Sequence, residues 1–261
     1  MSTVNLAEAA AEAPDTAIRP VSKPRGRVRW VICGLLFAAV VLSYIDRLVL
    51  GVLKPQLESL YGWTNTGYGD ITGYFQICYG LGFLAFGWLI DRIGPRAGYL
   101  LAMGMWTIGH FAQVLATTTF GFVIARIPLA LGEAGTYPSA LAAASQWFPK
   151  KERALAIGIF NAGANVGAII TPLLVSFIVA GLMFDWRWAF IITGLFNLVW
   201  LGAWWRFYRK PAEHPKVTVE ERAWIEAEPV EETGRTGFFK LLRHRETWAY
   251  MSGRFLIDPV W

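Results

Sequence analysis

The chain has 261 residues, of which 55% are hydrophobic, 15% aromatic and only 16% charged. Because a soluble domain carries about 25% charged residues, this composition excludes an ordinary soluble protein and indicates a membrane protein. The formal net charge of +5 would suggest a nucleic-acid partner in a soluble chain. Here lysine and arginine gather between apolar runs, where contact with lipid headgroups explains them better, so no nucleic-acid partner is expected.

The N-terminal segment, residues 1–28, opens with an alanine-rich and acidic stretch that has no apolar centre. A secretory signal peptide would need such a centre. We therefore expect a disordered cytoplasmic tail over residues 1–28.

Six apolar runs follow the tail, and each has about the 20 residues that a helix needs to cross a hydrocarbon layer of ~30 Å. The sequence therefore predicts an all-α membrane protein, with a six-helix transmembrane bundle over residues 29–208. The expected spans are residues 29–52, 68–90, 97–117, 119–147, 154–180 and 188–208.

Lysine and arginine are distributed unevenly between the segments that join these spans. They concentrate in the N-terminal segment, in residues 91–96 and 148–153, and after residue 208, whereas the alternate segments hold few. Since basic residues favour the cytoplasmic side, we expect a multi-pass protein of the cell (inner) membrane with its N-terminus in the cytoplasm.

The first three spans and the last three resemble each other weakly in where their charges lie. The first span of each triplet contains ionisable residues, and the turn after the second span contains an acid and an arginine. This pattern is typical of a 3+3 inverted repeat. The residues concerned are Asp46, Arg47, Arg126 and Glu133 in the spans and Asp91, Arg92, Asp185 and Arg187 in the turns.

Residues 209–245 form a polar connector that we place in the cytoplasm. Thr218 and Glu221 have the spacing of a capping box, which predicts a short helix through about Glu228. Residues 237–245 predict a basic amphipathic helix at the membrane surface. Residues 246–261 begin another apolar segment, so we expect the chain to end inside a seventh transmembrane helix and to be a fragment that is inactive alone.

Several polar side chains share helix faces inside the apolar runs. Arg126 and Glu133 are seven residues apart and so lie nearly on one face. Polar groups on apolar helices cost least when they meet around one wet cavity, which makes this pair the expected partner of Asp46 and Arg47. The other pairs that share a face are Tyr44 with Arg47, Gln76 with Tyr79, and Asn161 with Asn165.

These residue types indicate two roles. An arginine stays charged and forks onto a carboxylate, so Arg47 and Arg126 are candidates for binding an anion. A carboxyl group enclosed among helices can take up and release protons, which makes Asp46 and Glu133 candidates for proton coupling. The same four residues could instead form a fixed ion-pair cluster that locks the first and fourth helices together.

Other polar and small residues leave their roles open. Gln76 and Asn161 suit interhelical hydrogen bonds as well as they suit substrate contact. His110 stands alone in its span, which favours helix packing over proton transfer. Gly158, Gly163 and Gly167 favour close helix packing or bending. Tryptophans near span ends are expected to anchor the membrane interface, namely Trp30, Trp63, Trp186, Trp188 and Trp204.

The sequence shows no nucleophile elbow, metal-ligand spacing or phosphate-binding loop, so we expect no enzyme, no metal and no cofactor. Both cysteines, Cys33 and Cys78, lie in apolar runs and are expected to be small buried side chains without a disulfide.

The segment between the second and third spans resembles the loop signature of the major facilitator superfamily, although Pro95 replaces its first basic residue. Glycine in this signature permits close helix approach, and its charged residues pair across the turn and with a neighbouring helix end. In the family this loop latches conformations and does not bind substrate. The latch residues that the resemblance implies are Gly87, Asp91, Arg92, Gly94 and Arg96.

Further stretches resemble the anion–cation symporter branch of this superfamily, and residues 241–261 look like the entry to the seventh helix of hexuronate transporters. The matching stretches are residues 44–47, 125–134 and 147–154. The resemblance implies an alternating-access symporter of protons with a hexuronate or related sugar acid. It also implies the division of roles given above, with Tyr79 in contact with the substrate. Where some relatives carry a glutamine near position 164, this chain has Ala164.

The expected partners are a small anion, protons, the lipid bilayer and the C-terminal half of the same transporter. Two alternatives remain. One is a transporter of another monocarboxylate or aromatic acid, for which Tyr44, Phe75 and Tyr79 would also be suitable. The other is a membrane receptor or scaffold that does not transport and whose charge cluster is structural.

Overall fold

The computed structural model describes residues 26–227 and 243–257, and the secondary structure of these residues is entirely helical. It divides into two compact units, residues 1–227 and 228–261, which are considered separately. The expected all-α class is confirmed. Most of the N-terminal tail predicted at residues 1–28 and most of the amphipathic helix predicted at residues 237–245 lie outside the described residues.

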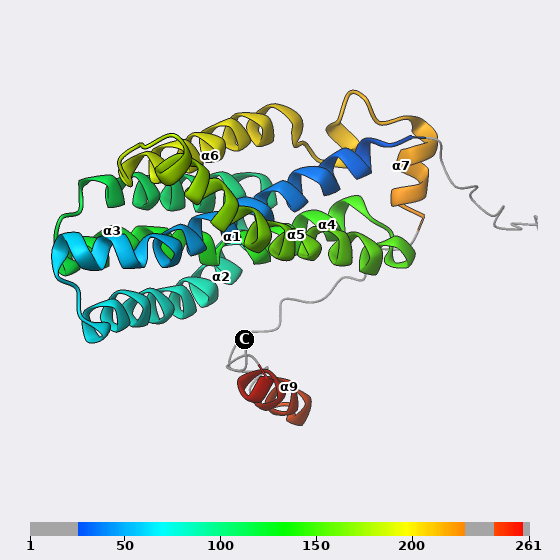
Figure 1. Ribbon diagram of the computed structural model, residues 1–261. Coiled ribbons are helices and arrows are strands. Elements are labelled where there is room, and N and C mark those ends of the chain that lie inside the picture. The colour runs from blue at the N-terminus through cyan, green and yellow to red at the C-terminus, as the bar shows by residue number, and fades with distance from the viewer. Residues whose placement is uncertain (1–25, 228–242, 258–261) are drawn as a thin grey trace, which may run out of the picture. The chain divides into compact units, whose positions relative to one another are not determined.

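The first unit contains seven α-helices among its described residues and the second contains one (Figure 1). The helices are α1 (Val28–Tyr61), α2 (Asn65–Ala112), α3 (Thr119–Ala134), α4 (Thr136–Trp147), α5 (Lys150–Ser176), α6 (Arg187–Phe207), α7 (Val219–Ile225) and α9 (Arg245–Ile257). Three short turns of helix accompany them, at Gln113–Leu115, Phe177–Gly181 and Pro211–Glu213.

Four of these stretches are long and apolar enough to cross a membrane, namely Val28–Tyr61, Asn65–Leu115, Lys150–Gly181 and Arg187–Phe207. Helix α2 contains both the second and third predicted spans. Its one non-helical residue is Gly94, whose φ of 78° favours glycine, and Pro95 follows it. Helices α3 and α4 together occupy the fourth predicted span and are divided at Gly135. The number of six crossings stays a prediction.

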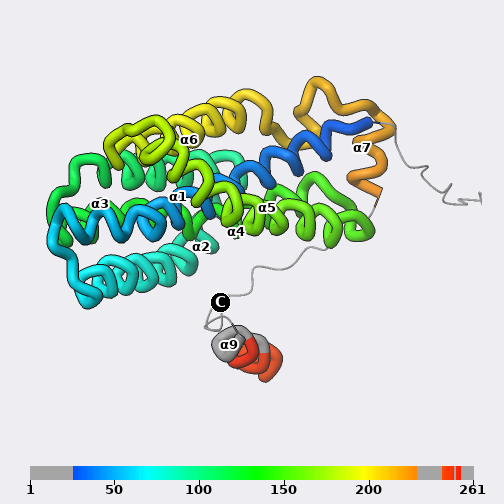
Figure 2. The backbone as a smooth tube through the Cα atoms, viewed as in Figure 1, coloured from blue at the N-terminus to red at the C-terminus, as the bar shows by residue number. Residues whose placement is uncertain are grey.

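Helix α1 passes through the middle of the bundle, and its most extensive contact is with α5 (Figure 2). Glycines make this contact close. A Cβ atom at Gly163 would lie 2.8 Å from the carbonyl oxygen of Phe37, and one at Gly167 would lie 2.6 Å from that of Val41. The packing role predicted for these two glycines is confirmed. Gly158 has open space around its Cα, so it does not pack in this way.

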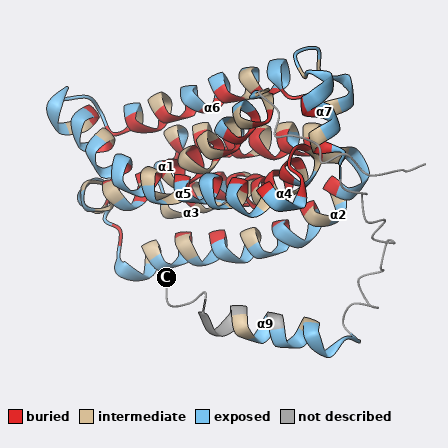
Figure 3. Cartoon of the chain, turned by 90° about the vertical axis from the view of Figure 1, so that its right-hand side faces the viewer, coloured by how far each residue is buried: buried red, intermediate tan, exposed pale blue. Residues whose placement is uncertain are grey.

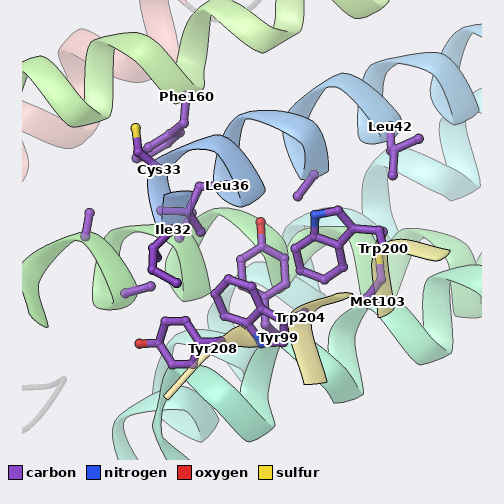
Figure 4. Packing of buried hydrophobic residues seen from close by; sticks show 14 of the residues in the cluster. Ile32, Cys33, Leu36, Leu42, Tyr99, Met103, Phe160, Trp200, Trp204 and Tyr208 are labelled. Carbon is purple, nitrogen blue, oxygen red and sulfur yellow. The ribbon is translucent and has the colours of Figure 1, made fainter. Parts of the chain in front are cut away.

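Buried residues occupy the inward faces of the helices, and exposed residues their outer faces (Figure 3). Three aromatic rings at the end of α6, Trp200, Trp204 and Tyr208, stack in the larger core cluster, and Tyr99 of α2 packs against them at a tilt (Figure 4). Trp63, Trp186 and Trp204 are fully or almost fully buried. The prediction that these three tryptophans anchor the membrane interface is therefore wrong, because neighbouring helices cover them.

Helix α7 is attached to the start of α1 through Glu221. The Thr218 hydroxyl accepts a hydrogen bond from the Glu221 amide, which confirms half of the predicted capping box. The other half is wrong. The buried Glu221 carboxylate accepts hydrogen bonds from the amides of Val28 and Arg29 and so caps α1. The helix also ends earlier than predicted, at Ile225.

Arg29 completes this attachment between three helices. It is 1% exposed and donates to Glu221 of α7 at 3.1 Å and to Glu152 of α5 at 2.9 Å. Figure 1 places α7 beside the first turn of α1. The first part of the connector is thus a packed element of the bundle, because an arginine buried at this depth needs both carboxylates.

Replacing Glu221 by alanine is expected to release α7 from the bundle, since it takes one of two carboxylates from a buried arginine at a cost on the order of 3 kcal/mol. Trypsin should then cleave after Arg222 about tenfold faster or more. Glu220→Ala is the matched control, because Glu220 is exposed on the same helix. Equal cleavage rates in the two variants would show that Glu221 does not hold α7.

Candidate functional site

The centre of the candidate site is an ion pair between α1 and α3. The Arg47 guanidinium donates to Oε1 of Glu133 from Nη2 at 2.7 Å and from Nε at 3.0 Å. The Ser43 hydroxyl donates to the same oxygen at 2.6 Å. Glu133 is fully buried, whereas the Arg47 side chain is 29% exposed. The second oxygen of Glu133, Oε2, has no hydrogen-bond partner among the described residues.

Aromatic rings surround the Arg47 guanidinium. Its carbon Cζ lies 4.9 Å from the ring centre of Tyr79, 5.6 Å from that of Phe75 and 5.7 Å from that of Tyr44. Phe75 and Tyr79 are one turn apart on α2 and stack on each other. Aromatic faces attract a cation and also present a flat apolar wall, so this arrangement suits the binding of a small organic anion beside Arg47.

Arg126 of α3 lies against the same Phe75 ring, with its Cζ 4.5 Å from the ring centre. It is only 4% exposed, and it forms no ion pair with a carboxylate among the described residues. Its Nε atom also has no hydrogen-bond partner there. The charge of Glu133 acts on Arg126 without an ion pair between them, so an anion from elsewhere could still pair with this buried guanidinium and offset the cost of its burial.

Asp46 has partners other than those expected from the sequence. It points away from Arg47, into the contact of α1 with α2 and α6, and is 1% exposed. The Asn197 amide donates to its Oδ2, and Nε2 of His110 lies 3.4 Å from its Oδ1. Successive helix residues point about 100° apart, which explains the separation of these neighbours. Arg47, Arg126 and Glu133 gather around Phe75, and Asp46 lies in a second cluster.

Two of the other candidate residues are not brought into this cluster. Gln76 and Asn161 are exposed and form no hydrogen bond to the described residues. Their part in substrate contact stays a prediction. Tyr44 and Tyr79 do lie at the site through their rings.

The predicted latch segment contains one contact that reaches another helix. Arg96 donates from Nη2 to the backbone carbonyl of Trp205 near the end of α6, at 3.0 Å. Arg92 lies over the ring of Trp88 instead, with its Cζ 3.8 Å from the ring centre, and Asp91 forms no ion pair with a described residue. A Cβ at Gly87 would meet nothing within 4 Å, so the close helix approach expected there is absent from the described chain.

Two residues of these clusters, Ser43 and Asn197, were not named from the sequence, whereas Phe75 was named only for an alternative aromatic substrate and His110 was assigned to packing. Ser43 lies one turn before Arg47, and Phe75 lies one turn before Tyr79, so helical spacing from the known candidates would have found both. His110 and Asn197 are polar residues in apolar runs, and only the packing of α2 and α6 onto α1 gives them a shared partner. Among the described residues no group of acidic, histidine or cysteine side chains could hold a metal ion.

Apolar helices that enclose ionisable side chains are typical of membrane transport proteins. The comparison with protein families agrees, because the model of the Major Facilitator Superfamily matches residues 36–258. The chain therefore belongs to the Major Facilitator Superfamily. The curated relatives of the chain are named as transporters, and it spans between about half and 69% of their length.

Individual curated relatives and a solved structure show which members of the family resemble this chain. It is 32% identical over 90% of its length to the galacturonate transporter of Dickeya chrysanthemi, and covers 69% of that protein. It is also 32% identical over 90% of its length to the hexuronate transporter of Escherichia coli K12, of which it covers 55%. A solved structure also shares the fold, that of a bacterial homologue of the human lysosomal transporter Spinster in an inward-facing unoccupied conformation. The TM-score is 0.68 at 22% sequence identity, and the match covers 84% of this chain and 49% of that one.

Proposed function

We propose that the protein transports an organic anion, first of all a hexuronate or a related sugar acid, together with protons by alternating access. The single observation that carries this proposal is Arg126, a buried guanidinium without a carboxylate partner among the described residues. The names of the two curated relatives support sugar acids as the substrate class. We also propose the orientation predicted from the sequence, with the N-terminus in the cytoplasm.

In this proposal the substrate carboxylate binds the free Arg126, because a guanidinium can donate two parallel hydrogen bonds to it. Arg47 lies near the same Phe75 ring and forms an ion pair with Glu133. Tyr44, Tyr79 and Phe75 form the apolar wall against one face of the sugar ring. Gln76 and Asn161 are proposed to contact the hydroxyl groups of the substrate.

Glu133 is the group through which a proton would act on the anion site. A proton on its carboxyl group cancels the charge that holds Arg47, so Arg47 becomes free to bind the substrate as well. Loss of the proton restores the ion pair and releases the substrate. Asp46 is proposed as a second proton carrier, in its own cluster.

Uptake into proteoliposomes tests the proposal, using the whole transporter that contains this chain. Radiolabelled galacturonate should accumulate above its external concentration when the proton gradient points inward, and a protonophore should abolish that accumulation. Neutral galactose should not compete, since it cannot pair with Arg126. Accumulation that does not respond to the proton gradient would contradict proton coupling.

The same assay separates the alternatives. Competition by benzoate but not by uronates and aldonates would identify an aromatic acid as substrate, for which the rings around Arg47 are also suited. Binding of uronates without any uptake would indicate a receptor, in which the ion pair has only a structural role.

A further inference from the structure

The Asp46 cluster contains a histidine that sequence reasoning assigned to packing. His110 of α2 is fully buried, and its Nε2 lies 2.8 Å from Oγ1 of Thr193 and 3.4 Å from Oδ1 of Asp46. One ring nitrogen thus lies within reach of two acceptors on two different helices, α6 and α1. The other ring nitrogen, Nδ1, has no partner among the described residues.

Thr193 fixes which atom donates. Its hydroxyl donates to the carbonyl of Ala189 one turn earlier, at 2.9 Å, so its oxygen is left to accept from His110. We therefore assign the imidazole proton to Nε2, from which it donates a hydrogen bond to Oγ1 of Thr193. Oδ1 of Asp46 meanwhile has no hydrogen bond among the described residues, although this imidazole lies beside it.

The charge of Asp46 decides between the two acceptors. A neutral carboxyl group attracts the imidazole N–H weakly, so the hydrogen bond to Thr193 persists. An ionised carboxylate is the stronger acceptor, because hydrogen bonds to charged groups contribute about twice as much as neutral ones. A movement of the ring by well under 1 Å would then bring Nε2 from 3.4 Å to hydrogen-bond distance of Oδ1.

We infer that His110 is a positioning residue for the proton site at Asp46, whose Nε2–H moves from Thr193 to Asp46 when that carboxyl group loses its proton. The inference rests on the proposed proton coupling. The imidazole keeps its own proton throughout, and the proton exchanged is that of the Asp46 carboxyl group. Protonation on α1 thereby changes a contact between α2 and α6, on a different face of α1 from the anion site.

Few other groups act on this pair. Glu133 of α3 acts on Asp46 through its charge, and Arg126 of α3 acts on His110. Among the described residues, α6 contributes Thr193, Asn197 and the backbone of Phe190, and α2 contributes the Trp106 side chain; none of these groups titrates. The shared influence of α3 connects the pair electrostatically to the anion site.

Two substitutions should move the pH dependence of uptake in opposite directions. In His110→Leu the ionised Asp46 carboxylate loses a hydrogen-bond donor. Asp46 then keeps its proton to higher pH, and the midpoint of the pH profile of uptake rises by about one pH unit. In Thr193→Val the N–H has only Asp46 as acceptor, so the midpoint falls. His110→Gln, which keeps an N–H donor, should stay near the original midpoint.

Thr171→Val is the matched control for Thr193→Val. Thr171 is equally buried and also donates to a carbonyl one turn earlier, that of Gly167, but it meets no histidine. A purely structural role would move the midpoints of His110→Leu and Thr193→Val in the same direction or not at all. Either result would overturn the inference.

Histidine NMR provides a readout that does not depend on transport. The chain contains three histidines, His110, His214 and His244, so ¹⁵N-histidine labelling gives few signals. The Nε2–H proton of His110 should shift downfield as pH rises, and this shift should be absent in Asp46→Asn. A signal that does not change with pH, or that changes equally in Asp46→Asn, would refute the role of His110. If the NMR shift occurs as expected but sugar-acid uptake is missing, only the proposed function is refuted.

Discussion

Replacing Arg126 by lysine is expected to weaken sugar-acid binding by about 10- to 100-fold, which corresponds to the 1.5–3 kcal/mol of a hydrogen bond to a charged group. Lysine keeps the positive charge but cannot donate two parallel hydrogen bonds to a carboxylate. The lysine side chain would also cover less of the Phe75 ring than the Arg126 guanidinium does. The measurement is the apparent KM of galacturonate uptake in proteoliposomes, together with direct binding by thermal shift.

Arg222→Lys is the control for this substitution, since Arg222 is half-exposed on α7 and pairs with Glu226 of its own helix, its one ion-pair partner in the described part of the chain. Its KM should not change. An unaltered KM in Arg126→Lys as well would remove Arg126 from the substrate site, and the buried guanidinium would then need another explanation.

Replacing Glu133 by glutamine is expected to abolish accumulation against a gradient. Glutamine has nearly the same shape and can still accept hydrogen bonds from Ser43 and Arg47, so the helices should remain packed. It cannot bind or release a proton at this position, and it no longer holds Arg47 by charge. Arg47 is therefore free at all pH values, and sugar-acid binding should lose its dependence on proton uptake at Glu133.

The measurement compares uphill uptake with exchange of labelled for unlabelled substrate, which needs no net proton movement. We expect uphill uptake to disappear while exchange continues. Glu58→Gln is the control, because Glu58 forms a partly exposed ion pair with Lys54 that contributes little to stability. Uphill accumulation at the original level in Glu133→Gln would show that this carboxyl group does not couple protons.

The helices could be predicted from the sequence because the length and apolar composition of each run determine them. Runs such as residues 29–52 and 188–208 are too apolar and too long for anything but membrane helices, and α1 and α6 contain them. The break at Gly94 was also readable, since glycine followed by proline ends a helix. The Arg47–Glu133 pair was anticipated because two opposite charges in apolar helices have few other ways to offset their burial.

What the sequence could not provide is the rotation of each helix about its axis. Trp186 and Trp204 have the position along the chain of interface anchors, but their neighbours cover them, and only the helix packing decides this. Asp46 was assigned to the anion site because Arg47 adjoins it. Its true partners come from residues 110 and 197, which no spacing rule connects to position 46.

The divergence of Asp46 and Arg47 has a mechanical consequence. Both side chains are fixed to one rigid segment of α1, one facing α2 and α6 and the other facing α3. Any rotation of α1 about its long axis moves both side chains by the same angle, so it changes both sets of contacts at once. Movement of α1 therefore cannot adjust the contacts of Asp46 and those of Arg47 separately. Only substitutions of the side chains that face these two residues can do so.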